Sequence, residues 1–289
     1  MTDRARSVLV MSRQRLRDSL VGAGFYVALS AGLAVAFAAV AGFTTAVDSS
    51  GFDYRQSPLY SVLGGLIAGA FGPSLLARIL AQGPLAFALH VGAVPVVLYL
   101  SVSSIHRFCA ERSSGALELY TYGPADAMAC VLASIVKDTT LTVVGLLSLL
   151  LLCAAAGAVN NLAAPPSLLA FAAELFLGAS CIYAYGLLVA LCVDNGSAAI
   201  SLFIGVVVIF VLALVGSHAV VIGRGVEAAA EFAAAIGWLS PLGYWAIFVS
   251  ARSAADLPGI IGGVAGPLAL AAALLAACHL AAKTRGVRS

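Results

Sequence analysis

The stretch Glu111-Arg-Ser-Ser-Gly-Ala-Leu-Glu-Leu119, closed by Gly123-Pro124, lies between two long apolar runs at about 84–106 and 139–158. It is polar and compatible with a helix, whereas nearly everything around it is apolar enough to lie in lipid. Because a polar insert between two such runs has to reach water, the stretch indicates a contact surface on a protein that crosses the bilayer several times.

The composition of the whole chain supports this interpretation. Of 289 residues, 62% are hydrophobic and only 10% are charged, and the mean hydropathy is +1.06. Soluble domains carry about 25% charged residues, so this composition predicts an integral membrane protein. The net charge of +2 is too small to indicate a nucleic-acid partner, and no basic cluster is interleaved with aromatic residues.

The six cysteines include no Cys-x-x-Cys pair. Most lie inside apolar runs, where a thiol behaves as a small hydrophobic group, which favours that role over metal or redox chemistry. The first apolar run starts near Val21 and lacks a cleavage site, so we expect it to be retained as a membrane span.

A helix needs about 20 apolar residues to cross the hydrocarbon core, and six runs are long enough. We therefore predict an all-α polytopic membrane protein with one transmembrane domain over 1–289. The predicted spans are 21–47, 84–106, 139–158, 167–192, 198–222 and 258–282.

The distribution of basic residues predicts that both termini are cytoplasmic. With six spans, eleven of the fifteen basic residues fall on that side, which satisfies the positive-inside rule. If the Gly-rich run 59–82 also crossed the membrane, about eight basic residues would lie on the cytoplasmic side and seven on the outer side. We therefore expect 59–82 to be a re-entrant or interfacial segment on the outer side, and a seventh span is the alternative.

Two further segments are expected at the membrane surfaces. Residues 1–20 place leucines on one helical stripe with arginines beside it, which suits an inner-surface helix among lipid headgroups; a solvated basic tail is the alternative. Near 227–251, an acidic, Ala-rich stretch is followed by Trp238, Tyr244 and Trp245, which predicts a second re-entrant or interfacial segment on the outer side.

The polar insert is expected to form a short helical bend. The preceding span is expected to continue as a helix through Glu111, Arg112, Glu118 and Tyr120, and Gly123-Pro124 breaks it. Pro124 then starts the next helix, which places Asp126 in the first turn, a position favourable to the helix dipole. A bend continuous with two membrane helices can transmit force from a soluble partner, although a simple solvated loop is the alternative.

This insert also resembles a known family. Glu111-Arg112-Ser-Ser-Gly115-Ala-Leu117-Glu118-Leu119, then Gly123-Pro124 and a helix reaching Lys137, is similar to the signature that follows the second span in ABC-2-type ABC transporter permeases. The order of the other elements resembles that family over most of the chain, including Leu239-Ser240-Pro241-Leu242 before the last span.

The resemblance implies the six-span permease subunit of an ATP-driven exporter or flippase in an inner (plasma) membrane. It implies that 107–137 is a coupling-helix region docking on a separate ATPase subunit, which binds ATP and Mg. A second permease copy or a paralogue, and membrane lipids, are the other implied partners. The implied ATPase-interface residues are Glu111, Arg112, Gly115, Leu117, Glu118 and Leu119.

The two lysines argue that the chain is not itself the ATPase. A phosphate-binding loop needs Gly-x-x-x-x-Gly-Lys-[Ser/Thr], and neither Lys137 nor Lys283 follows a glycine. ATP hydrolysis is therefore expected in another polypeptide, and this chain is predicted to have no catalytic residues.

Three ionisable residues fall within predicted spans, where such residues are costly. His90, Glu174 and His218 lie at similar depth in the outer third of three spans. They are candidates for a polar path. The favoured alternative is that each packs against another helix with a local hydrogen bond, or extends to the outer interface.

Functions from other classes stay open at this point. An integral-membrane enzyme or a secondary transporter acting on a lipid or hydrophobic substrate is the alternative to a permease. The chain has no His-Glu-x-x-His motif and no aspartate cluster, which disfavours a metal-dependent enzyme.

Overall fold

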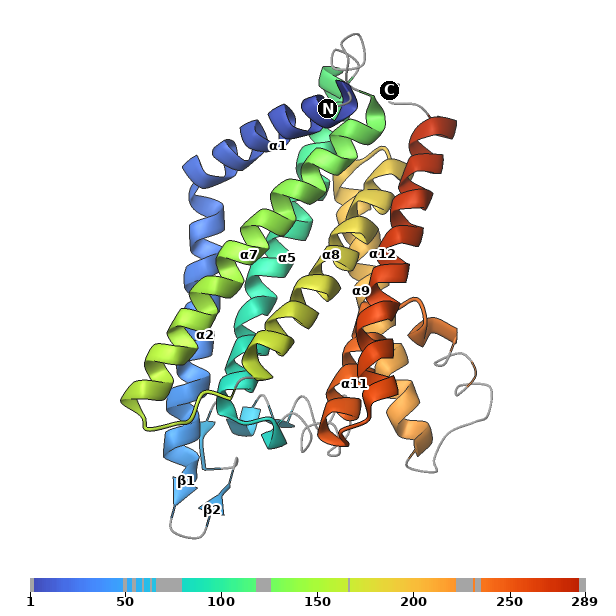
Figure 1. The fold of residues 1–289 in the computed structure, drawn as a ribbon. Coiled ribbons are helices and arrows are strands. Elements are labelled where there is room, and N and C mark those ends of the chain that lie inside the picture. Colours follow the sequence, from blue (N-terminus) through green and yellow to red (C-terminus); the bar gives the residue numbers. More distant parts are fainter. Residues whose placement is uncertain are drawn as a thin grey trace.

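The computed structural model describes residues 3–48, 51–53, 56–58, 60–62, 64–65, 80–117, 126–165, 167–221, 231 and 235–285. Long helices dominate this part of the chain, with one hairpin of two-residue strands that the sequence did not predict (Figure 1). The elements are α1 (Asp3–Val21), α2 (Ala23–Ala46), β1 (Val47–Asp48), β2 (Gly51–Phe52), α5 (Pro84–Ser113), α7 (Ala127–Val159), α8 (Ser167–Cys192), α9 (Gly196–Val221), α11 (Pro241–Ser253) and α12 (Leu257–Arg285).

Six of the described helices are long and apolar enough to cross a membrane, which confirms the prediction of a multi-pass transmembrane protein. Two of them extend past the predicted spans into charged sequence. Helix α5 continues beyond 106, and α7 begins at Ala127 after the Asp126 cap, as the sequence indicated. Helix α5 ends at Ser113, however, and not beyond Glu118 and Tyr120 as predicted, because Gly115 turns the chain with a positive φ. The charged side chains of both extensions have partners within the bundle.

The beginning of α1 and the end of α12 lie at the same end of the bundle, here called the α1 end (Figure 1). The β1–β2 hairpin marks the opposite end, the hairpin end. The chain turns at Gly22, whose backbone is extended, so α1 lies across the bundle at an angle to α2. Which end faces the cytoplasm stays a prediction.

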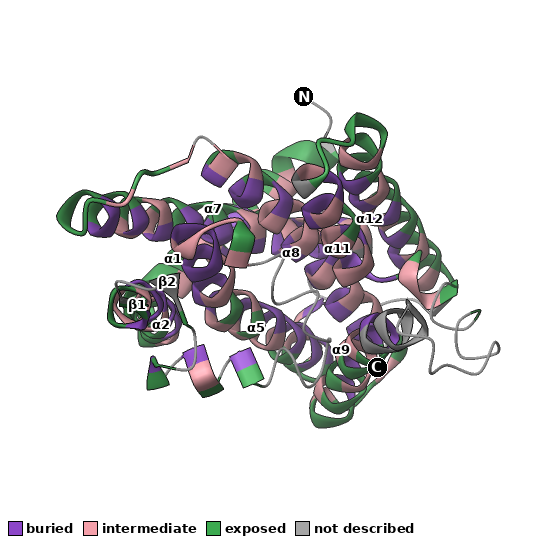
Figure 2. Cartoon of the chain, turned by 90° about the horizontal axis from the view of Figure 1, so that it is seen from below, coloured by how far each residue is buried: buried purple, intermediate pink, exposed green. Residues whose placement is uncertain are grey.

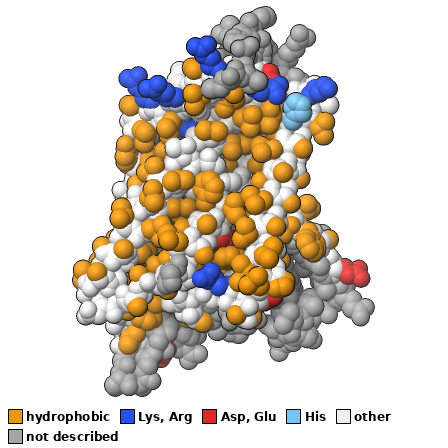
Figure 3. Space-filling view, in the orientation of Figure 1, with side chains coloured by type: hydrophobic (Ala, Val, Ile, Leu, Met, Phe, Trp, Pro, Cys, Tyr) orange, Lys and Arg blue, Asp and Glu red, His pale blue; other side chains and the backbone are white. Residues whose placement is uncertain are grey.

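Helix α5 is central to the packing. It contacts α2, α7, α8 and α9, and 15 of its residues are buried. Buried side chains line the inside of the bundle and exposed ones its outside (Figure 2). Much of that outside surface is apolar, with Leu151 72% exposed and Leu169 69% exposed (Figure 3). Such a surface is suited to lipid contact.

The predicted re-entrant segment near 227–251 is described from 235 onward and at 231. Ser240 caps α11 by accepting from the Gly243 amide, and α11 forms a helical hairpin with α12. Tyr185, in the C-terminal half of α8, donates to the Leu239 carbonyl at 2.5 Å. The turn at 238–240 therefore packs beside α8 with Trp238 69% and Leu239 56% exposed, while Tyr244 and Tyr185 donate to the two backbone carbonyls.

Of the other predicted re-entrant segment, 59–82, the structure describes only 60–62, 64–65 and 80–82. Tyr60 is 1% exposed, and its ring lies 5.0 Å from that of Phe87 in α5. The beginning of this segment thus packs on the hairpin end. The rest of 59–82 lies outside the described residues, and its path stays a prediction.

Glycine allows α2 and α5 to approach closely. A Cβ at Gly32 would lie 2.4 Å from the Gly92 carbonyl oxygen, and one at Gly92 would lie 2.9 Å from the Ala36 Cβ. Interfaces of small residues are a principal source of helix association in lipid, because burial from water cannot contribute there.

We predict that Gly92→Ala destabilises the protein by about 1–3 kcal/mol, because the added methyl overpacks this interface. Thermal or chemical unfolding of the purified protein in detergent measures the effect. Gly205→Ala is the matched control, since a Cβ there meets nothing within 4 Å. Equal stability of the Gly92→Ala protein and the wild type would contradict the proposed contact.

Candidate functional site

A stripe of polar residues runs along α7 at every fourth position: Asp126, Cys130, Ser134, Asp138 and Thr142. Residues four apart are neighbours on a helix surface, but each step goes slightly beyond one turn, so the stripe winds around α7 and meets different helices along its length. It faces the interior of the bundle, where Cys130, Ser134, Asp138 and Thr142 are buried. We call it the α7 stripe, and each of its levels has a partner on another helix.

The first levels of the α7 stripe are bound by α1. Arg4 forms an ion pair with Asp126, whose carboxylate also caps α7 by accepting from the Ala129 amide. One turn deeper, Arg15 donates to the Cys130 carbonyl at 2.9 Å and to the Ser134 hydroxyl. Arg15 is 4% exposed, so α1 is fixed to α7 by a buried guanidinium.

The same guanidinium ties α1 to α5. Arg15 forms an ion pair with Glu111, and the other oxygen of Glu111 accepts from Arg107 Nε at 2.8 Å. Arg107 also binds Asp18 of α1 at 2.8 Å. The Glu111 side chain is only 14% exposed. It therefore points into the bundle as the acceptor that joins α1 and α5.

The deepest charged level of the α7 stripe is an ion pair within a membrane-spanning helix. Lys137 Nζ and Asp138 Oδ1 are 2.8 Å apart, and the two side chains are 3% and 0% exposed. Ser104 of α5 lies between the charges, donating to Asp138 at 2.5 Å and accepting from Lys137 at 2.9 Å. Charged groups at this depth are unfavourable unless paired, so the contact constrains α5 and α7 strongly.

The α7 stripe ends at α8. The Thr142 and Tyr183 hydroxyls are 2.5 Å apart, and Thr142 also donates to the Asp138 carbonyl at 2.8 Å. Polar contacts therefore continue from the α1 end, through α7, to the middle of α8. Sequence reasoning missed this arrangement, although the spacing of four between polar residues in an apolar helix was a usable signal.

Arg112 has a different role from the neighbouring Glu111. It donates to the backbone carbonyls of Leu191 and Val193 and lies 3.2 Å from the Asp194 carboxylate. These groups are at the C-terminal end of α8, where a cation satisfies free carbonyls and complements the helix dipole. Arg112 thus fixes α5 to the α8–α9 turn.

The helix α5 ends just after this contact. Gly115 has a positive φ of 73°, a conformation that glycine adopts without steric cost. Leu117 returns to the core and is 0% exposed, packed among Ile105, Phe108 and other apolar side chains. Ser113 and Ser114 are exposed, whereas Glu118 and Leu119 lie outside the described residues.

The predicted interface residues are therefore placed in two ways. The side chains of Glu111, Arg112 and Leu117 contact the protein itself, and Gly115 forms the turn. Contact with a partner stays a prediction for all six residues. In this structure the side chains of the first three hold the segment in position rather than forming its outer surface.

The candidate polar path near the hairpin end is only partly assembled. His90 Nδ1 donates to the Ala86 carbonyl of the same helix at 2.7 Å, and the ring lies 5.3 Å from Phe171 and 5.6 Å from Trp245. Glu174, one turn after Phe171 on α8, is 3% exposed. The His218 side chain lies outside the described residues, so a common patch of all three stays a prediction.

Three polar atoms in this region have no hydrogen-bond partner among the residues that the structure describes. They are His90 Nε2, Glu174 Oε2 and Trp245 Nε1. Buried polar atoms usually have a hydrogen-bond partner. These three atoms therefore mark a place where a water or a substrate group would bind, or where the protein would adopt another conformation.

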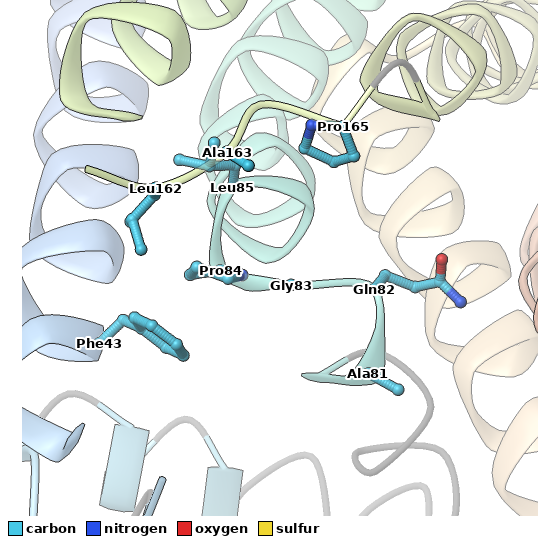
Figure 4. A pocket seen from close by; sticks show the side chains of 9 residues that line it. All are labelled: Phe43, Ala81, Gln82, Gly83, Pro84, Leu85, Leu162, Ala163 and Pro165. Atoms are coloured by element: carbon cyan, nitrogen blue, oxygen red, sulfur yellow. The ribbon is translucent and has the colours of Figure 1, made fainter. Parts of the chain in front are cut away.

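A cavity of about 300 Å³ opens at the hairpin end (Figure 4). Phe43, Pro84, Leu85 and Leu162 line it, and among the described lining residues Gln82 alone has a polar side chain. The described part of the lining thus contains no titratable group.

The described residues include no group of three His, Cys, Asp or Glu side chains that could hold a metal ion. The six cysteines, all of which are described, form no disulfide, and five are buried. Their placement agrees with the predicted role as small apolar side chains.

A scan against protein-family models finds no match to the chain, and searches for similar curated proteins and similar solved structures also find none.

We predict that Asp138→Leu destabilises the protein by about 3–5 kcal/mol, because it leaves the Lys137 charge buried without its counter-ion. The double variant Lys137→Met/Asp138→Leu should recover most of this loss, since no buried charge remains. Unfolding in detergent measures both variants. A double variant as unstable as the single one would contradict the ion-pair interpretation.

Proposed function

We propose that this chain is the membrane subunit of an ATP-driven transporter of the ABC-2 type, an exporter or flippase. Segment 107–137 would dock on a separate ATPase subunit that binds ATP and Mg. The resemblance of 111–124 to the family signature is the sequence basis of this proposal. Its structural support is the firm attachment of that segment to the bundle.

The observation that carries the proposal is the double contact of Glu111 with Arg15 and Arg107. A coupling segment must move membrane helices when its partner moves, and a solvated loop cannot do so. Here the segment continues directly from α5, and α1 is fixed to it by buried ion pairs. Displacement of the segment would therefore move α1 and α5 together.

The α7 stripe extends this mechanical connection. Segment 107–137 ends within α7, where Arg15 holds Ser134 and Ser104 holds the Lys137–Asp138 pair. From there the Thr142–Tyr183 contact reaches α8. Force applied at the α1 end would therefore be transmitted through a continuous series of polar contacts to α5, α7 and α8. This fits a rearrangement of the bundle that is driven by a partner subunit.

The residues of the predicted interface take separate roles in this proposal. Glu111 and Arg112 are positioning residues, because their partners are within the chain. The exposed Ser113 and Ser114, together with Glu118 and Leu119, would contact the ATPase. The proposal also includes a second permease copy or a paralogue, a cytoplasmic α1 end and an inner (plasma) membrane location.

A secondary transporter for a lipid or hydrophobic substrate is a second candidate. It is favoured by the buried Lys137–Asp138 pair and by Glu174, because ionisable groups within membrane spans often mark ion or proton routes. In that case transport by the reconstituted chain alone would follow an ion gradient, and Glu174→Gln would abolish it.

The permease proposal is tested by purifying the tagged chain from native membranes in mild detergent and identifying what stays bound. We expect a stoichiometric partner with a phosphate-binding loop. Glu118→Lys should remove this partner and leave the unfolding temperature of the chain unchanged, because the charge reversal falls on the contact surface.

Glu111→Gln is the matched variant in the same segment. We expect it to lower the unfolding temperature of the isolated chain, because it removes the negative charge that two arginines share and replaces one of the two acceptor oxygens with a donor. Recovery of the chain without any ATPase, even from native membranes, would contradict the permease proposal.

A further inference from the structure

The exposed face of α1 carries three arginines. Arg6, Arg13 and Arg17 are spaced by seven and four residues, so they lie on one side of the helix. All three are exposed, and none forms an ion pair with an acidic side chain in the described part of the chain. Arg4 and Arg15 of the same helix, by contrast, are paired. The outer face therefore presents three cations that the fold does not neutralise.

Large apolar side chains flank these arginines on the same face. Leu9 is 59% exposed, Val10 61% and Val21 80%. On an α-helix, Leu9 and Leu20 fall on one side of the arginine row, and Val10 and Val21 on the other. A helix in water would turn such side chains toward the protein, so this face does not have the pattern of a water-exposed surface.

The protein-facing side of α1 carries the buried Ser12 and Arg15, which are 6% and 4% exposed, together with Met11 and Leu16, which pack against the core. The helix thus has its own contacts to the bundle and still presents leucine and valine side chains outward, with cations between them. This arrangement suits a layer that is apolar on one side and rich in anions on the other, as the headgroup region of a bilayer is.

The position of α1 agrees with that layer. It lies across the end of the bundle, where the membrane-spanning helices α5 and α12 end (Figure 1). Most of the Lys and Arg side chains visible in Figure 3 gather at this end. A helix at the end of the spans, with Leu and Val pointing outward, lies at the depth where acyl chains meet headgroups.

We propose that Arg6, Arg13 and Arg17 form a binding surface for the phosphate groups of anionic phospholipids. Guanidinium groups bind phosphate oxygens through paired, charge-assisted hydrogen bonds. Leu9, Val10, Leu20 and Val21 enter the acyl boundary beside them. This surface does not depend on the identity of any ATPase or transported substrate.

The proposal has a consequence for the opposite face of the helix. Arg15 binds Glu111 of α5 and Ser134 of α7. Lipid bound to the outer face of α1 therefore acts on the helix whose inner face, through Arg15, holds α5 and α7. Anionic lipid should stabilise the contact between α1 and the bundle.

The test uses the full-length protein in a neutral detergent, titrated with phosphatidylglycerol and followed by the rise in unfolding temperature. Phosphatidylcholine with the same acyl chains and soluble glycerol phosphate are titrated in parallel. We expect a rise with phosphatidylglycerol and no comparable rise with the other two.

Substitution then assigns the effect to α1. Each arginine near an anionic surface contributes about fivefold in affinity, so Arg6→Gln/Arg13→Gln/Arg17→Gln should weaken phosphatidylglycerol binding about a hundredfold. Lys283→Gln, on the exposed surface of α12 at the same end, is the control and should bind as the wild type does. Leu9→Gln/Val10→Gln should also weaken binding, although every charge is kept.

Three results would overturn the proposal. One is an unchanged response of the triple arginine variant to phosphatidylglycerol. Another is equal stabilisation by glycerol phosphate, which would indicate a site for free phosphate. The third is cross-linking from Gln14 to an acidic protein in the purified complex. Such a protein would cover α1, and the face would then be a protein interface.

Discussion

An ionised side chain within a membrane-spanning bundle needs a partner, and this constraint fixes the α1 end of the protein. Water cannot solvate Arg15, Lys137 or Asp138 where they lie, so each must be satisfied by the chain itself. Lys137 and Asp138 pair with each other within α7, and the remaining partners come from other helices: Ser104 of α5 for this pair, and Glu111 of α5 and Ser134 of α7 for Arg15. Helices α1, α5 and α7 can therefore adopt few relative positions in which no charge is left unpaired.

The two ends of the bundle differ in how completely they satisfy their polar groups. At the α1 end, the residues of the α7 stripe from Asp126 to Thr142 have partners, although the buried Asp138 Oδ1 contacts Lys137 as an ion pair without a hydrogen bond. Near the hairpin end, His90, Glu174 and Trp245 each have a buried polar atom without a partner among the described residues. The paired end suits transmission of force, and the unpaired region suits binding of a polar group or a second conformation. The function proposed above would use both properties, in separate places.

The sequence predicted the spans better than their ends. Apolar runs of about 20 residues identify membrane helices because the hydrocarbon core has a fixed thickness. Counting apolar residues stops at charges, so the predicted spans end near 106 and begin near 139, although the sequence indicated that both helices continue into the polar insert. No local pattern reveals which residues of other helices pair with Arg107 and Lys137, namely Asp18 and Ser104. The resemblance placed Glu111 at a partner's contact surface, and the sequence did not predict its pairing with Arg15 of α1.

The sequence by itself determined the class of protein, the number of long apolar helices and the position of the polar insert between two of them. These follow from local composition, because lipid imposes the same length and polarity on every span. Only the tertiary structure decided which way each charged side chain turns: Glu111 and Arg15 inward, and Arg6, Arg13 and Arg17 outward. The direction depends on which helix lies opposite, and the partner for a buried charge can be almost one hundred residues away along the chain, as Arg15 is from Glu111.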